Sequence, residues 1–197
     1  MAGKRLLIDP GNLSRMWHGQ TDLDAILVTH AHPDHVDPEG LPALIAANPG
    51  ALIGVEAGVA QAMALPAKVC RLGAGQRFSI GPVDIETGGG LHAIIHRDYP
   101  LVGNIGFVLR APGQPCFFHP GDALDWAPCG VDMVAIPAYG PWAAVKETIE
   151  FARAVGAPNG FLIHDGLLNQ RGRQLIATHL GALSQTRLVD MSQPWEG

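Results

Sequence analysis

The segment from Thr29 to His35 gathers the side chains of this chain that are best suited to metal chemistry. Three histidines and one aspartate fall within six positions: His30, His32, Asp34 and His35. Neutral imidazole and carboxylate groups are ligands for zinc and similar divalent metals. A solvated loop that is merely rich in histidine is the plain alternative, but this density of ligand types favours a metal site.

The chain around this cluster predicts how its side chains are presented. The apolar run Ala25–Val28 comes directly before it and is typical of a buried strand, and the prolines that follow predict an irregular loop. On a loop at a strand end the first two histidines can face one way while the Asp-His pair turns another. Such an arrangement fits two adjacent metals better than one.

Two later segments also place a ligand type just after an apolar strand. Asp122 follows the strand predicted at 115–119, and His164 follows directly on the strand predicted at 161–163. Loops at strand ends often carry sites, so both side chains are candidates for the same centre.

A further histidine ligand is expected in the segment 91–96. His92 and His96 are four residues apart, so on a strand they would share one face and either could reach a metal. His96 is favoured because an irregular loop begins there. His92 would then either contact a metal-coordinating side chain or pack in the core.

Alternating strand and helix patterns in the rest of the chain predict helices layered on sheets. Strands are expected at 6–8, 51–55, 68–72, 77–80, 83–87, 104–111 and 131–136, and helices at 38–48, 57–64, 143–155 and 170–183.

Length and composition predict one globular domain spanning residues 1–197, since 47% of the residues are hydrophobic and 16% are charged. The net charge of −5 and the lack of any Lys/Arg run argue against nucleic-acid binding and favour a small-molecule substrate. No apolar stretch approaches the ~20 residues of a membrane span. Cys70, Cys116 and Cys129 form no C-x-x-C pair and indicate a reducing, cytoplasmic location. A homo-oligomer is compatible with all of this.

The ordered set of H-x-H-x-D-H, a later His, G-D and a final strand-end His resembles the metallo-β-lactamase superfamily. Within it, the chain looks most like the branch that includes ascorbate-6-phosphate lactonase, on the segments Leu7–Gly11, Phe118–Asp122 and Ile163–Asp165. The match runs from Leu6 to about Leu168. It implies an α/β fold, a four-layer αβ/βα sandwich. Members usually begin with a hairpin before the position of Asp9; here the hairpin is absent, exposing a sheet edge, or the sequence starts short.

The resemblance also implies which residues hold metal. One ion would be held by His30, His32 and His96, and the other by Asp34, His35 and His164, with Asp122 bridging both. The expected cofactors are two divalent ions, with Zn²⁺ first and Mn²⁺, Fe²⁺ or Ni²⁺ as alternatives.

Two cations in such a site can share a hydroxide that attacks an electrophilic carbon or phosphorus. Asp34 could orient this nucleophile or relay its proton, so Asp34 and Asp122 are the catalytic candidates. The ligands need neighbours that fix their tautomers, a role open to Asp9, Thr29 or Asp165. Candidates for contacting the ligands or lining the pocket are Asp9, His92, Arg97, His119, Tyr139, Trp142 and Asp165.

The predicted function is a dinuclear metal-dependent hydrolase of a small lactone, ester or phosphodiester. A metal-binding sensing or scaffold protein without turnover, and an iron-dependent redox protein on the same scaffold, are the alternatives.

Overall fold

The computed structural model describes residues 1–66 and 68–191, which form two β-sheets and four α-helices. The smaller sheet has the order β1-β2-β3-β4 and is parallel throughout, with β1 at Leu6–Ile8, β2 at Ala25–Val28, β3 at Leu52–Glu56 and β4 at Cys70–Leu72. The larger sheet is mixed, in the order β11-β10-β9-β8-β7-β6-β5. Its strands are β5 (Arg77–Ile80), β6 (Val83–Leu91), β7 (Gly103–Arg110), β8 (Phe117–His119), β9 (Met133–Pro137), β10 (Asn159–Ile163) and β11 (Arg187–Leu188).

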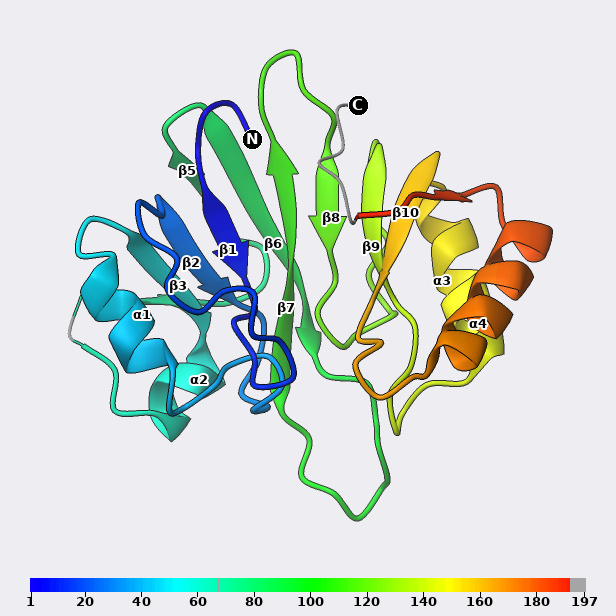
Figure 1. The fold of residues 1–197 in the computed structure, drawn as a ribbon, viewed down its shortest axis with the longest axis horizontal. Helices are drawn as coiled ribbons and strands as arrows, with labels where there is room; N and C mark the ends of the chain where they lie inside the picture. Colours follow the sequence, from blue (N-terminus) through cyan, green and yellow to red (C-terminus); the bar gives the residue numbers. More distant parts are fainter. Residues whose placement is uncertain (67, 192–197) are drawn as a thin grey trace.

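Four layers are stacked in the order helix, sheet, sheet, helix (Figure 1). The helices α1 (Leu41–Ala47) and α2 (Ala57–Ala62) cover the small sheet, and α3 (Val145–Val155) and α4 (Gln170–Leu183) cover the large one. The predicted four-layer α/β sandwich is therefore confirmed.

Three apolar clusters fill the spaces between these layers. In β2, Ile26 and Val28 pack with α1, while Ala25 and Leu27 face the large sheet, because successive side chains of a strand point to opposite faces. This strand is buried on both faces, as expected for a parallel strand between two layers. The third cluster joins the large sheet to α3 and α4 and includes Phe118.

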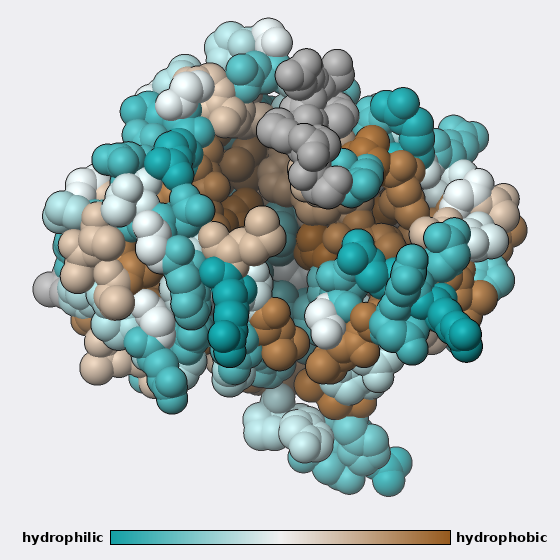
Figure 2. All heavy atoms as spheres, in the orientation of Figure 1, coloured by the Kyte–Doolittle hydropathy of each residue, from teal (hydrophilic) through white to brown (hydrophobic). Residues whose placement is uncertain are grey.

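The strand β1 is the edge of the small sheet, and residues 1–5 before it form a turn and no strand. Beside this edge, a groove of about 570 Å³ opens between the two sheets and is lined by Leu6, Ile8, Leu109 and Phe117. Figure 2 shows apolar side chains deep in this hollow, near the top of the view. The exposed sheet edge expected from the sequence is thus present in the described residues.

The directions of the strands bring the candidate ligands to one end of the sandwich. In the large sheet β6 and β8 are both antiparallel to β7, and β8, β9 and β10 are parallel to one another. The carboxyl ends of β6, β8, β9 and β10 therefore lie at the same edge, toward the bottom of Figure 1, where β1 and β2 of the small sheet also end. Loops at the carboxyl ends of strands are the usual place for ligands in α/β folds.

Several element boundaries differ from the expectation. The helix predicted from residue 38 begins at Leu41, with a proline in its first turn, because proline is tolerated only there. The strand β6 ends at Leu91, so residues 92–96 form a loop instead of a strand. The two-residue strand β11 was not predicted. In the described part of the chain, no helix has both the length and the apolar character needed to cross a bilayer.

Candidate metal centre

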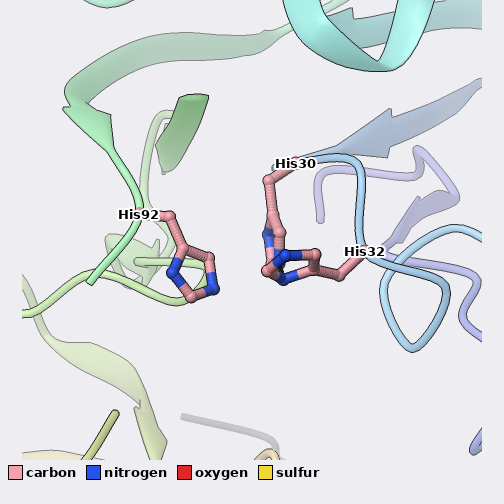
Figure 3. Close-up of side chains that lie close together, drawn as sticks. All are labelled: His30, His32 and His92. Atoms are coloured by element: carbon pink, nitrogen blue, oxygen red, sulfur yellow. Dashed lines mark hydrogen bonds between the residues drawn. The ribbon is translucent and has the colours of Figure 1, made fainter. Parts of the chain in front are cut away.

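Three histidines from two separate loops converge at the carboxyl end of β2. His30 and His32 come from the loop after β2, and His92 is the first residue after β6. Figure 3 shows the first two rings on one side and His92 facing them from the other. One ring nitrogen of each residue lies within 4.8 Å of those of the other two, a spacing that suits a shared cation.

A second group, formed by Asp34, His35 and His164, lies beside the first. One potential ligand atom of each of these residues also lies within 4.8 Å of those of the other two. Asp122, in the loop after β8, lies between the two groups. Its Oδ1 is 3.1 Å from Nε2 of His35, and its Oδ2 is 3.1 Å from Nε2 of His164 and 3.4 Å from Nε2 of His92. A carboxylate in this position can serve two adjacent cations.

Unpaired polar atoms at this centre show that these residues fit divalent cations. Four buried atoms make no hydrogen bond: Nε2 of His35, His92 and His164, and Oδ1 of Asp122. A buried polar atom without a hydrogen bond costs about 1–3 kcal/mol, so a cluster of four calls for a further partner. Because all four belong to the groups that could coordinate a metal, cations are the partner whose chemistry fits.

Asp9, the first residue after β1, fixes two of the histidine rings. Its carboxylate accepts hydrogen bonds from the backbone N–H and the hydroxyl of Thr29, both at 2.8 Å, and lies 2.7 Å from Nδ1 of His35. Since the hydroxyl of Thr29 donates to Asp9, it can accept from Nδ1 of His30 at 2.9 Å. Nε2 of both histidines then points into the centre, where that of His30 lies 3.1 Å from Nδ1 of His32.

Backbone carbonyls fix the rings of two more histidines, again through Nδ1. Nδ1 of His92 lies 2.6 Å from the carbonyl oxygen of Ala93, and Nδ1 of His164 contacts the carbonyl oxygen of Tyr139. In each ring Nδ1 is therefore a donor and Nε2 points into the centre. His164 and Asp9 both have positive φ angles, 53° and 52°, a backbone conformation that is strained for residues other than glycine.

The pKa shifts indicate that His30 is neutral, whereas His35 is protonated. Burial, assisted by the nearby His35, holds the pKa of His30 well below its usual value, so its ring is neutral and ready to coordinate. Burial would also lower the pKa of His35, but the charge of Asp9 and the contact with Asp122 outweigh it and raise the pKa to about 10.

His164 behaves like His35. Burial opposes its protonation, yet contacts with Asp122 and Asp34 raise its pKa to about 10. Burial alone would raise the pKa of Asp122, but contacts with His164, His35 and His92 lower it, and the contact with His164 also lowers the pKa of Asp34. Without cations, Asp34 and Asp122 are ionised and form ion pairs with protonated His35 and His164. Cations that bind here must displace those protons.

Two residues that the sequence did not assign as ligands hold Asp122 in place. The side chain of Asn104 accepts a hydrogen bond of 3.0 Å from the backbone N–H of Asp122 and donates one of 2.9 Å to the carbonyl of Pro120. Trp142 donates from Nε1 to Oδ2 of Asp122 at 3.0 Å. Asn104 was missed by sequence reasoning, although a single asparagine in the apolar strand β7 was a usable signal.

The loop that carries Asp34 packs directly on the loop after β1. The backbone N–H of Asn12 donates to the carbonyl of Pro33 at 2.9 Å, and that of Asp37 donates to the carbonyl of Pro10 at 2.9 Å. Gly11 is so close that a Cβ there would lie 1.6 Å from the carbonyl oxygen of Asp34. Only glycine allows this approach, which fixes the position of the second ligand group.

The structure brings together six of the seven side chains predicted as ligands: His30, His32, Asp34, His35, Asp122 and His164. The seventh, His96, lies apart from these six. It lies in the loop 92–102, largely exposed, with Nδ1 3.5 Å from Asp98. Because β6 ends at Leu91, the residue that reaches the centre is His92, which is buried.

The remaining candidates have different surroundings. His119 is buried, and its Nδ1 accepts a hydrogen bond from Gly121, but it belongs to neither ligand group. Arg97 is exposed, beside Asp98. Tyr139 contributes its carbonyl to His164 while its side chain is exposed. Asp165 pairs with Arg173 at 2.8 Å. Trp142 contacts Asp122, as described above.

Comparisons with known proteins show the family and the fold of this chain. The family model described as a beta-lactamase superfamily domain matches residues 1–158. Protein Rv0786c of Mycobacterium tuberculosis is 33% identical over 183 residues, covering 92% of this chain and 85% of that protein. Among solved structures, Igni18, a metallo hydrolase of Ignicoccus hospitalis, superposes with a TM-score of 0.69 at 14% identity, covering 96% of this chain and 89% of that one. The metallo-beta-lactamase fold protein YhfI of Bacillus subtilis gives 0.64 at 15% identity, with 94% and 83% covered.

Proposed function

This chain belongs to the metallo-β-lactamase superfamily and has the fold of metal-dependent hydrolases, and from that premise we propose that it hydrolyses a small ester, lactone or phosphodiester with two divalent cations. The observation that carries the proposal is the set of four buried atoms without hydrogen bonds, all directed into one centre. We rank a lactone slightly first, on the resemblance described above, and Zn²⁺ first among the ions.

Each group of ligands would hold one cation. His30, His32 and His92 would hold the first, and Asp34, His35 and His164 the second, with Asp122 shared because it contacts members of both groups. When bound, such cations lower the pKa of a water molecule toward ~7 and polarise a substrate oxygen, so no serine or cysteine nucleophile is needed.

The protein's own groups then orient the reactants. Asp34 is half-buried, so one side of its carboxylate faces solvent while Oδ2 lies 3.1 Å from His164. Its lowered pKa keeps it ionised at neutral pH, so its carboxylate can orient an attacking water by accepting a hydrogen bond from it. The hydrogen bond from Trp142 fixes the orientation of Asp122.

The net charge of −5 and the absence of a Lys/Arg run favour a small substrate over a nucleic acid. A cytoplasmic protein acting on a small metabolite, alone or as a homo-oligomer, is the context we propose.

Metal analysis combined with a hydrolase panel tests the function. We expect purified protein to contain up to two divalent ions and to hydrolyse members of a panel of lactones, esters and phosphodiesters. Activity should survive gel filtration, vanish after treatment with a chelator and return on addition of Zn²⁺ or Mn²⁺. Chelator-resistant turnover, or turnover that needs an added flavin or nicotinamide, would contradict the proposal. Metal-loaded protein with no turnover across the panel would favour a sensing or scaffold role.

A further inference from the structure

A mostly apolar cavity of about 700 Å³ adjoins the candidate metal centre. Its walls come from the loop 92–102, the loop after β8 and the helix α3, and its apolar lining includes Leu91, Ile94, Leu101, Leu124 and Phe151. This volume lies within the roughly 300–1,000 Å³ of small-molecule sites, which are lined mainly by such side chains. The cavity is therefore large enough for part of a small substrate.

Two side chains belong to both the cavity and the metal centre. His92 lines the cavity, while its Nε2 lies 3.4 Å from Asp122. Trp142 also lines the cavity, while its Nε1 donates to Asp122. The two rings, with centroids 6.0 Å apart, form the common wall. The cavity therefore lies directly next to the metal centre.

The charges around the cavity are all of one sign. Asp125, Glu147 and Glu150 line it, and no lysine or arginine is among the described residues that do so. On the same helix, Arg153 pairs with Glu150 at 3.1 Å, and both side chains are largely exposed. A carboxylate or phosphate group would be repelled from such a cavity, whereas an uncharged apolar group loses nothing by entering it.

We infer that this cavity receives an uncharged apolar group of the substrate, such as an aryl ring or a medium-length acyl chain, while the bond to be cleaved lies at the metal centre. The inference rests on the proposed function and narrows it. The preferred substrates are hydrophobic esters or lactones without an anionic tail, which separates this chain from hydrolases of phosphorylated small molecules.

Binding of hydroxamates to the metal-loaded protein tests the inference without turnover. Acetohydroxamate reports on the metal centre alone. Octanohydroxamate adds an apolar chain, and the monohydroxamate of octanedioic acid adds a chain of the same length that ends in a carboxylate. Burial of three methylenes at about 4-fold each raises affinity by about 60-fold. We expect octanohydroxamate to bind at least that much more tightly than acetohydroxamate in calorimetric titrations, and the carboxylated probe to gain little.

Two variants locate the chain of the probe. Ala154 lines the cavity from the exposed side of α3, so Ala154→Trp should remove most of the gain from the octyl chain and leave acetohydroxamate binding unchanged. Ala182→Trp, on the exposed surface of α4 and away from the cavity, is the matched control. Glu150→Lys replaces an exposed carboxylate at the cavity and should raise affinity for the carboxylated probe about 10-fold.

An octyl chain that adds no affinity in the parent protein, or a gain that Ala154→Trp leaves intact, would overturn the inference. Equal affinity for the neutral and carboxylated probes would also overturn it. If acetohydroxamate itself fails to bind the metal-loaded protein, the metal centre is wrong and the inference falls with it. This outcome is distinct from the other three, in which acetohydroxamate still binds.

Discussion

Trp142 and Asp122, twenty residues apart in the sequence, are joined by a hydrogen bond of 3.0 Å from the indole Nε1 to the carboxylate Oδ2. The same carboxylate lies against His35, His92 and His164. The indole therefore limits how the shared aspartate can turn, and it also forms part of the wall of the apolar cavity.

Trp142→Phe keeps most of the aromatic ring and removes the N–H donor. We expect metal affinity to fall by about 10-fold, the lower end of the effect of a residue that orients a ligand, with the number of ions bound at saturation unchanged. Competition with a fluorescent chelator measures the affinity. Trp126→Phe, which alters an indole that packs on Phe118 away from the centre, is the control and should leave affinity intact. Equal affinities for all three proteins would contradict the role of Trp142.

Replacing His92 and His96 separately tests the position of the third histidine ligand. His92→Ala removes a buried ring whose Nε2 faces the centre, so we expect metal affinity at one site to fall by more than about 100-fold. His96→Ala removes an exposed ring beside Asp98 and should change neither metal content nor stability. Elemental analysis after gel filtration gives the metal content, and a loss confined to His96→Ala would return the ligand to that residue.

Asp122→Ala and His164→Ala should differ in how many ions they lose. Asp122 contacts histidines of both ligand groups, whereas His164 belongs to one. We expect the first variant to bind both ions weakly and the second to retain about one ion per chain. Titration with Zn²⁺ followed by elemental analysis distinguishes them. Parent-like metal content and activity in Asp122→Ala would show that the carboxylate is not shared.

The stability of the metal-free protein should depend on pH in a defined direction. The folded-state pKa values of His35 and His164, about 10, exceed the usual value of about 6.5, so their contribution is full below pH ~6.5 and is lost as pH rises through ~10. The lowered pKa values of Asp34 and Asp122 add stability above pH ~4 that is lost on further acidification.

The lowered pKa values of His30, His32 and His119 remove stability as the pH falls below ~6.5. We therefore expect the Tm of chelator-treated protein to be highest near pH ~6.5 and to decline toward pH ~10. In the metal-loaded protein this alkaline decline should be much smaller, because the cations replace the two protons. Thermal unfolding followed by circular dichroism across this range measures both. A Tm of the metal-free protein that rises steadily from pH 6.5 to 10 would contradict the assignment of charges.

Gly11→Ala tests the contact between the two loops that carry Asp9 and Asp34. An added Cβ would lie 1.6 Å from the carbonyl oxygen of Asp34, so the loops must separate. We expect a loss of at least about 1–3 kcal/mol in the free energy of unfolding, the usual cost of overpacking, together with weaker metal binding. Gly50→Ala introduces a Cβ with no atom within 4 Å and serves as the control. Urea unfolding of the metal-free proteins gives the free energy of unfolding of each variant. Similar free energies for the two variants would contradict the contact.

The sequence by itself determined the types of the ligands, their order and the elements that precede them. The apolar run at β2, the H-x-H-x-D-H segment and the strand ends before Asp122 and His164 are local signals, because burial and turn formation depend on neighbouring residues. The alternation of strands and helices predicted helices layered on sheets, and the family resemblance implied their four-layer arrangement.

Only the tertiary structure decided which side chains meet. His92 reaches the centre because β6 leaves the sheet at Leu91, where the backbone N–H of Ala93 donates to the carbonyl of Asp122 at 2.8 Å, and no local pattern marks that point. The hydrogen bonds of Asn104 and Trp142 with Asp122 likewise join residues from different strands and loops. Such contacts depend on how strands far apart in the sequence pair and on where each one ends, so a single sequence, read by its local spacing, does not contain them.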